Sequence, residues 1–531
     1  MGTYLNPGNS GFTRIVNSDY VDKTGMIALI NQTIDTTRNL ICVSRPRRFG
    51  KSYAAQMLCA YYDKTVDSKE LFSNYKIAKT PDFYEYINHY DVIYLDMTHI
   101  LNESDKDNFI DYIKTSITEE IQKSYPEVEI SDTLSTTLIN TVEYTGNKFV
   151  AIIDEWDAPI RITSRQEQLW LDFLRMLFKS SGTTARIFAA AYMTGILPIK
   201  KDSSQSALSD FWEYTIFNPL EYSEYVGFTE DEVLGLCKAY GRDFSNIKKW
   251  YDGYTVGEIH SIYNPFSVMC ALKSGIYTSY WRNTSVAETL MTYIDLDEEG
   301  LQQDIAKLIA GEKIVVDPFF FQNDVVNFTS KDDVLTLMIH LGYLTYEEVP
   351  DSYGDDDTMT GFAWIPNEEV RTEFEKILRK AKHKDLVELV KKSDQLLKDT
   401  IAGNEAAVSA AFDQIRDTSY APTFYNNEQS LRYAIKMAYL SCVDQYARVE
   451  ELPAGHGIAD VVFIPKRSSS LPAMIVELKW DKPAEGAIAQ IKARNYPAFL
   501  KGYGGDIILT GISYDSESGK HSCEIEVVRS S

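Results

Sequence analysis

A short run of residues near the amino terminus has the composition of a phosphate-binding loop. Gly50, Lys51 and Ser52 follow an apolar stretch and begin a segment with helical periodicity. At such a junction backbone N–H groups point at an anion, the lysine adds positive charge, and the serine hydroxyl can ligate Mg²⁺. The common pattern begins with a glycine where this chain has Arg45, and Gly-Lys-Ser alone also occurs by chance at helix starts.

Two acidic residues end another apolar stretch, residues 149–154, much further along the chain. Asp154 is placed to hold Mg²⁺ through water, and Glu155 to polarise an attacking water, as phosphoryl transfer requires. Acids at strand ends also occur as solvated caps. Because both halves of the site end strands of one alternating pattern, we predict a nucleotide-binding site with Mg²⁺ held by Ser52 and Asp154.

Three further residues are candidates for contact with the nucleotide. Arg47 and Arg48 lie within the loop, where two guanidinium groups either neutralise the γ-phosphate, clamp a neighbouring element, or form an exposed basic turn. Thr194 ends the following apolar stretch, where it either senses the γ-phosphate or is an ordinary strand-end threonine.

A second set of chemically capable residues lies near the carboxyl terminus. Asp460 is followed after sixteen residues by Glu477, Leu478 and Lys479. The period of two in a strand puts Glu477 and Lys479 on one face. Carboxylates from adjacent strands form a hard-oxygen site for Mg²⁺, and the lysine can stabilise a pentacoordinate phosphate. The alternative is a strand-edge ion pair between Glu477 and a lysine.

The elements that must position these residues follow from hydrophobic periodicity. In the first 200 residues the pattern predicts strands at 39–44, 91–97, 149–154 and 186–194, and helices at 51–62, 106–123 and 166–179. This alternation predicts an α/β fold with a parallel sheet covered on both faces. Residues 226–345 are predicted to be mostly helical, with turns at Gly253 and at Asn264 and Pro265. Further on, the pattern predicts helices across 373–416 and strands at 459–464, 473–478 and 506–512.

Composition narrows the function classes. The 531 residues carry a formal net charge of −24, which argues against a protein that coats nucleic acid. Residues 461–501 nevertheless hold seven Lys and Arg against three Asp and Glu. The six cysteines are scattered without a Cys-x-x-Cys pair, which indicates a reducing compartment. Without a visible secretory signal or long apolar stretch, we expect a cytoplasmic protein with no membrane partner.

The motifs of the first two thirds of the chain resemble those of the AAA-ATPase-like family of bacterial proteins. The matching segments are 20–24, 45–52, 153–159, 194–196, 250–254, 263–267, 280–281, 342–344 and 365–371, in the order in which that family has them. In that family R-P-R-R-F-G-K-S replaces the loop with the usual first glycine. The resemblance implies a P-loop NTPase core, a helical lid, and ATP bound by Arg47, Arg48, Phe49, Gly50, Lys51, Ser52, Asp154 and Thr194, with Glu155 catalytic.

The carboxy-terminal motif resembles the PD-(D/E)xK nuclease superfamily, whose domain usually follows that ATPase-like domain. Glu428 matches its helical acid and Gln490 the glutamine of its following helix, whereas Ala459 replaces the proline of its name. The resemblance implies an α/β restriction-endonuclease-like fold with catalytic Asp460, Glu477 and Lys479. It also implies Mg²⁺, or Mn²⁺, held by Asp460, Glu477 and Glu428.

We therefore expect four segments: a P-loop core (1–225), a mostly helical lid (226–372), a helical connector (373–404) and a nuclease-like domain (405–531). The leading hypothesis is an ATPase that drives or licenses a Mg²⁺-dependent nuclease acting on DNA or RNA, with defence against foreign nucleic acid suggested by analogy. Closure of the lid, or of a second copy of the chain in a homo-oligomer, would change the exposure of the site formed by Asp460, Glu477 and Lys479. Two alternatives stay open: an ATP-switched binding or signalling protein that does not cut, and a nuclease with a non-hydrolysing ATP clamp.

Overall fold

The computed structural model describes the chain at residues 2–105, 108–162, 166–179, 181–199, 201–202, 205–206, 208–281, 301–309, 311–319, 321, 328, 330–349, 360–380, 384–416, 431, 435, 438–439, 446–454, 457–465, 471–493 and 505–528. The chain divides into two compact units. The first consists of Met1–Tyr280 and Val315–Glu369, and the second of Trp281–Ile314 and Val370–Ser531. This division is coarser than the four expected segments, which stay a prediction.

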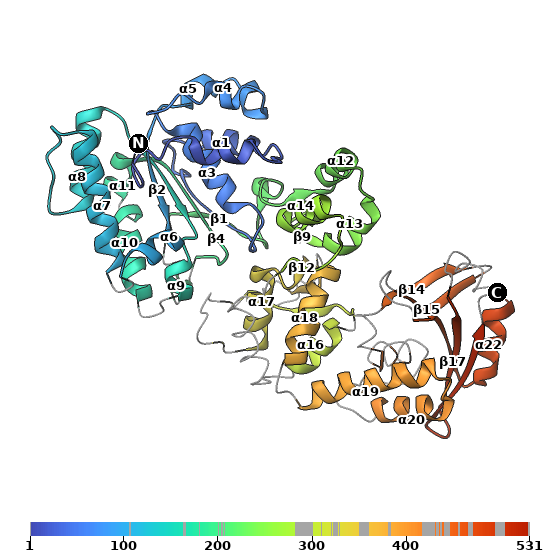
Figure 1. Cartoon of the computed structure of the whole chain (residues 1–531). Helices are drawn as coiled ribbons and strands as arrows, with labels where there is room; N and C mark the ends of the chain where they lie inside the picture. The colour runs from blue at the N-terminus through green and yellow to red at the C-terminus, as the bar shows by residue number, and fades with distance from the viewer. Residues whose placement is uncertain are drawn as a thin grey trace. The chain divides into compact units, whose positions relative to one another are not determined.

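Five parallel strands form the centre of the first unit, in the order β2-β3-β4-β1-β7 (Figure 1). They are β1 (Leu40–Ser44), β2 (Asp91–Asp96), β3 (Phe149–Asp154), β4 (Phe188–Gly195) and β7 (Trp212–Tyr214). Every residue of β1, β3 and β4 is buried, as in a parallel sheet covered on both faces. Ser44 pairs with Gly195, and Asp154 with Thr194, so the carboxyl ends of these strands meet at one edge.

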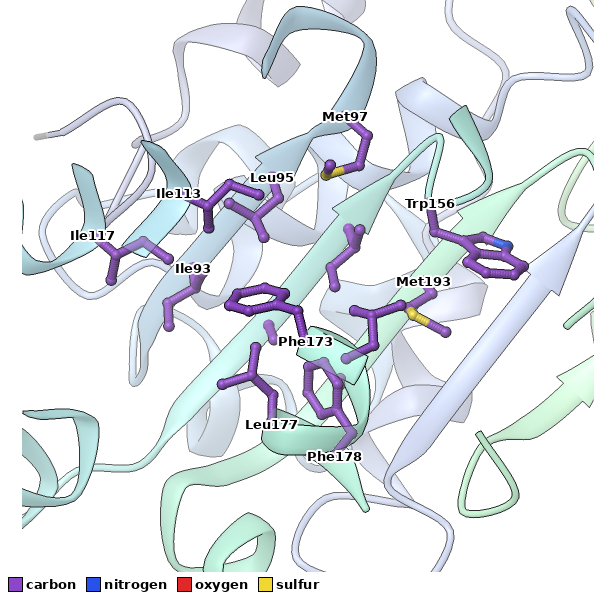
Figure 2. Packing of buried hydrophobic residues seen from close by; sticks show 14 of the residues in the cluster. Ile93, Leu95, Met97, Ile113, Ile117, Trp156, Phe173, Leu177, Phe178 and Met193 are labelled. Atoms are coloured by element: carbon purple, nitrogen blue, oxygen red, sulfur yellow. The ribbon is translucent and has the colours of Figure 1, made fainter. Parts of the chain in front are cut away.

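Helices cover both faces of this sheet, so the predicted α/β fold with a parallel sheet is confirmed. On one face α3 (Lys51–Tyr62) contacts β2, β3 and β4, and α1 (Ser10–Val16) packs on α3. The other face carries α6 (Met97–Glu103), α7 (Phe109–Ser124), α8 (Leu134–Thr145), α10 (Glu167–Phe178) and α11 (Ser181–Ile187). Figure 2 shows the core between them, where Leu95 of β2 lies among Ile113 of α7 and Phe173 of α10.

Shorter helices complete this part of the chain. They are α2 (Gly25–Asn31), α4 (Lys69–Phe72), η1 (Lys76–Lys79), α5 (Phe83–Tyr86) and α9 (Ala158–Ile162). Periodicity located the long elements well: the strand at 149–154 and the helix at 51–62 have their predicted bounds, and the others differ only at their ends.

The remainder of the first unit combines short strands with helices. Its elements are β5 (Lys201–Asp202), β6 (Gln205–Ser206), η3 (Leu220–Tyr222), β8 (Phe228–Thr229), α12 (Glu230–Tyr240), α13 (Phe244–Tyr251), β9 (Tyr254–Val256), β10 (Ile259–Tyr263), α14 (Pro265–Ser274), β11 (Ile314–Val316), α17 (Lys331–Leu341), β12 (Thr345–Glu348) and β13 (Gly361–Trp364). The helical prediction for 226–345 is therefore wrong where β8, β10 and β9 form an antiparallel sheet. These strands are too short to show a period of two, and Gly257, at a φ of 61°, turns the chain between two of them.

Both turns predicted in this region are present. Gly253 has a φ of 105°, which only glycine adopts readily, and it leads from α13 into β9. Asn264 caps α14, since its side chain accepts a hydrogen bond from the Ser267 N–H, and Pro265 occupies the first helical position.

The second unit contains a mixed five-stranded sheet in the order β14-β15-β16-β17-β18. The strands are β14 (Tyr446–Ala454), β15 (Gly457–Pro465), β16 (Ala473–Trp480), β17 (Ile507–Asp515) and β18 (Lys520–Val528). Only β16 and β17 run parallel, and α22 (Ala484–Ala493) lies between them in the chain and packs on both. The other helices are α16 (Leu301–Ile309), α18 (Glu368–Lys380), α19 (Lys384–Ile401) and α20 (Glu405–Arg416). The predicted strands are confirmed; β14 and β18 were not anticipated.

Among the described residues, no helix is both long enough and apolar enough to span a bilayer.

The turn at Gly253 generates a stability prediction. A Cβ atom at this position would lie 2.0 Å from the backbone oxygen of Pro366, in addition to the unfavourable positive φ. Gly241 also has a positive φ, 62°, but a Cβ there meets no atom within 4 Å. We expect Gly241→Ala to cost about 1 to 2 kcal/mol and Gly253→Ala clearly more, measured as the free energy of unfolding in urea. Equal losses in the two variants would contradict the described turn.

Candidate functional site

The loop between β1 and α3 has the backbone of an anion-binding turn. Gly50 precedes the first residue of α3 with a φ of 97°, and Arg48 has a φ of 67°. The first N–H groups of a helix have no partner within the helix, so those at the start of α3 are available to an anion. The predicted loop therefore lies at the end of a buried strand and the start of a twelve-residue helix.

The ammonium group of Lys51 is buried inside this loop. Its Nζ donates to the carbonyl of Pro46 at 3.1 Å and lies 3.8 Å from Oε1 of Glu155. The side chain is 3% exposed, so the loop and a carboxylate supply the partners that water would otherwise provide.

Arg45, which replaces the common first glycine, points away from the loop. Its guanidinium is buried and donates to the backbone carbonyls of Ser44, Tyr214 and Tyr222 at 2.8, 3.0 and 3.2 Å. Burial lowers the pKa of Arg45 to about 10. Its role in the described structure is therefore to fix the loop to β7 and η3.

The other loop residues contact residues 254–280 of the same unit. The Arg48 guanidinium lies 4.5 Å from the centre of the Phe266 ring and donates to the carbonyl of Tyr280 at 2.6 Å. The Phe49 ring is buried edge-on against Tyr254. Arg47 is partly buried, and burial, followed by the like charge of Arg161, lowers its pKa.

Asp154 and Ser52 meet across the carboxyl edge of the sheet. Asp154 is 2% exposed and accepts a hydrogen bond from the N–H of Glu155, and the Ser52 side chain is near enough to influence its pKa. Burial raises the pKa of Asp154 to about 7, and the negative charge of Glu155 adds to the shift, whereas the Ser52 hydrogen bond and the charge of Lys51 oppose it. A buried carboxylate beside a hydroxyl is a pair of hard-oxygen donors, which fits Mg²⁺.

Glu155 and Asp157 share a guanidinium. Arg161 on α9 donates to Oε2 of Glu155 at 2.5 Å and to Oδ2 of Asp157 at 2.8 Å. Asp157 is fully buried and also accepts the N–H groups of Ile196 and Leu197. Burial opposes the charge of Arg161, but the two carboxylates outweigh it and raise its pKa. Neither Arg161 nor the anchoring role of Asp157 was predicted. The spacing of four residues between Asp157 and Arg161, which allows an ion pair along a helix, was the feature of the sequence that could have indicated their contact.

Thr194 serves the sheet in the described structure. Its hydroxyl is fully buried and donates to the carbonyl of Val43 on the neighbouring strand at 2.9 Å. The hydroxyl bridges β1 and β4, and its contact with a nucleotide stays a prediction.

A cavity of about 430 Å³ opens beside the loop. Gly50, Lys51, Ser52 and Glu155 line its polar side. Aromatic side chains line much of the rest, namely Tyr20, Tyr53, Tyr225, Phe228 and Phe266. Volumes of roughly 300 to 1,000 Å³ are typical of small-molecule sites. These aromatic residues, the aromatic wall of the cavity, were not predicted, because they come from segments that are far apart in the sequence.

In the second unit, the predicted carboxy-terminal residues share one face of the sheet. Val461 pairs with Val476, which puts Asp460 and Glu477 at adjoining positions of β15 and β16. Oδ2 of Asp460 accepts the N–H of Leu478 at 2.9 Å. Lys479 lies 3.4 Å from Oε1 of Glu477, a side chain that is 3% exposed.

Gln490 of α22 also donates to Oε1 of Glu477, so this helix faces the predicted site. Glu428, the predicted helical acid, lies outside the described residues. Within the described part of the chain, no group of three or more His, Cys, Asp and Glu side chains is arranged to hold a metal ion. The predicted metal sites therefore have only pairs of candidate donors among the described residues, Ser52 with Asp154 and Asp460 with Glu477.

Comparison with known proteins finds a family match for residues 8–204. The AAA-ATPase-like family model, described as a predicted AAA-ATPase, matches residues 8–204, which include β1, the loop, α3 and β3. Among curated proteins, none matches the chain. The chain shows weak similarity to the Aeropyrum pernix ORC2 protein in ADPNP–ADP complexes (12% identity, TM-score 0.29, covering 68% of this chain and 96% of that one). Similarity to Aeropyrum pernix ORC1 in complex with DNA is weaker (9%, TM-score 0.25, 68% and 94%). The match of residues 8–204 shows that the chain contains an AAA-ATPase-like domain.

The raised pKa of Asp154 has a measurable consequence for stability. Because its pKa is about 7 in the folded chain and about 4 when unfolded, the folded chain binds the proton more tightly and loses stability as the pH rises between these values. Without metal and nucleotide, we expect Asp154→Asn to be more stable than wild type at pH 8, by at most about 4 kcal/mol. The gain in stability should shrink as the pH is lowered to about 4.

Asp111→Asn, at an exposed position on α7, is the control. A gain independent of pH would contradict the assignment.

Proposed function

We propose that the first unit binds and hydrolyses ATP, and that the second carries a Mg²⁺-dependent nuclease site. The observation that carries the ATPase proposal is the meeting of two sequence-distant halves: Lys51 and Ser52 from the start of α3, with Asp154 and Glu155 from the end of β3. The AAA-ATPase-like match supports ATP as the nucleotide.

In this proposal the triphosphate lies at the N-terminus of α3. The free N–H groups at Lys51 and Ser52 would bind phosphate oxygens, and the Lys51 ammonium would exchange its contact with the Pro46 carbonyl for the phosphates. The aromatic wall of the cavity, including Tyr20 and Tyr225, would stack on the base.

Ser52 and Asp154 would hold Mg²⁺, which when bound neutralises charge on the phosphate oxygens. Because Asp154 is buried, its loss of a proton on binding the cation would make nucleotide binding favour higher pH. Glu155 lines the cavity and carries a carboxylate that can orient and accept a proton from an attacking water.

A specific observation favours a second activity at the carboxyl terminus. Asp460 and Glu477 lie on adjacent strands, with Lys479 and Gln490 in contact with Glu477 on the same face. Two carboxylates would hold Mg²⁺ or Mn²⁺, and the lysine would stabilise charge on a phosphodiester, in the manner of the nuclease superfamily that this motif resembles.

The ATPase proposal is tested by paired substitutions. We expect Lys51→Ala to lose ATP binding, because the phosphates lose their buried cation. Glu155→Gln should keep ATP binding and lose about 100-fold or more in turnover, since only the proton acceptor is removed. Binding is measured by calorimetry and turnover by phosphate release, with the exposed Lys114→Ala as control. A wild-type protein that binds ATP without turning it over would favour the clamp alternative.

The nuclease proposal is tested on DNA and RNA with Mg²⁺ or Mn²⁺. We expect Asp460→Asn and Lys479→Ala each to reduce cleavage by at least about 100-fold, and Glu526→Gln, at a half-buried position on β18, to leave it unchanged. Binding of nucleic acid without cleavage under every metal condition would favour the binding or signalling alternative. If Lys51→Ala cuts at the wild-type rate with and without ATP, the two activities are not coupled.

A further inference from the structure

The carboxylate of Glu155 is held from behind the cavity. Glu155 lines the cavity, whereas Arg161 is not among the lining residues. The Arg161 guanidinium donates to Oε2 of Glu155 at 2.5 Å, which leaves Oε1 on the side of Lys51. Arg161 therefore contacts the proposed proton acceptor without reaching the space that a nucleotide would fill.

Arg161 is itself fixed by a carboxylate that has no freedom to move. Asp157 is fully buried and accepts two hydrogen bonds from Arg161, at 2.8 and 3.4 Å. The same carboxylate accepts the N–H groups of Ile196 and Leu197, at 3.3 and 3.1 Å, from the turn after β4. Separating Arg161 from Asp157 would leave a buried charge without its counter-ion, a change that typically costs several kcal/mol.

The two cations next to Glu155 thus differ in mobility. Lys51 is held by one carbonyl and by a contact of 3.8 Å with Glu155, so an arriving phosphate can draw it away. Arg161 is held by a forked pair to Asp157 and cannot follow.

We propose that Arg161 is the positioning residue of the ATPase site, because it holds the Glu155 carboxylate in the orientation needed to act on water. Asp157 in turn fixes Arg161 to the backbone that follows β4. This inference rests on the proposed ATPase function. Glu155 has a positive φ of 53°, an unfavourable conformation for a residue with a side chain, so its orientation depends on such an external support.

The test is a double-mutant cycle on the full chain. Arg161→Lys keeps the charge but loses the planar fork that binds the two carboxylates, and Arg161→Gln removes the charge. We expect both to lower kcat for ATP, by between about 10-fold and 100-fold and least for lysine, with ATP affinity changed less than about threefold. In a Glu155→Gln background, where there is no carboxylate to position, each should lower the residual kcat by less than about twofold.

Arg186→Gln is the matched control, because Arg186 makes an exposed pair with Glu143 and should leave kcat unchanged. The inference is overturned if kcat is unchanged or raised in the Arg161 variants, if the loss lies in ATP affinity, or if the same loss persists in the Glu155→Gln background, as it would for a general structural defect. If wild type does not hydrolyse ATP, the proposed function itself fails and the inference fails with it.

Discussion

The architecture of the amino-terminal site depends on the buried carboxylate of Asp157. It binds the backbone of Ile196 and Leu197, which joins the turn after β3 to the turn after β4. The approach is so close that a Cβ atom at position 195 would lie 2.6 Å from Asp157 Oδ1 and 2.7 Å from the Trp156 ring, which explains the glycine there. A charge in this position is tolerated because four hydrogen bonds, two of them from a guanidinium, replace its hydration.

The same edge of the sheet is joined to the phosphate loop. The hydroxyl of Ser44 donates to the carbonyl of Leu197, and the N–H of Arg45 to the carbonyl of Gly195. The loop after β1 and the acids after β3 are therefore both bound to one turn. Since that turn is buried, the loop and the acids are placed relative to each other by buried hydrogen bonds from Ser44, Arg45 and Asp157 and not by surface side chains.

The sequence was sufficient to predict the alternating strands and helices and to select candidate residues that the structure brings close together, because these depend on local periodicity and on short motifs. The sequence was not sufficient where a residue's contact partner lies far away along the chain. Phe49 is in the middle of the loop motif, yet its ring is buried against Tyr254. The hydroxyl of Thr194 bridges two strands, and the role of Arg161 becomes visible only when Asp157 is seen to be anchored. The short strands β8, β9 and β10 were missed because pairing across the sheet, rather than local preference, stabilises them.

Arg45 makes the loop depend on residues that lie outside its own sequence motif. Its guanidinium satisfies the carbonyls of Tyr214 and Tyr222, so the first half of the loop and residues 214–222 are complementary to each other. A single change to glycine would match the common motif more closely but would deprive three carbonyls of a donor and leave an empty space the size of an arginine side chain. Exchanging the arginine loop for the common glycine loop without loss of stability therefore requires changes in β7 and η3 as well. The effect of a substitution at Arg45 is thus expected to depend on which residues occupy positions 214–222, and the reverse holds as well.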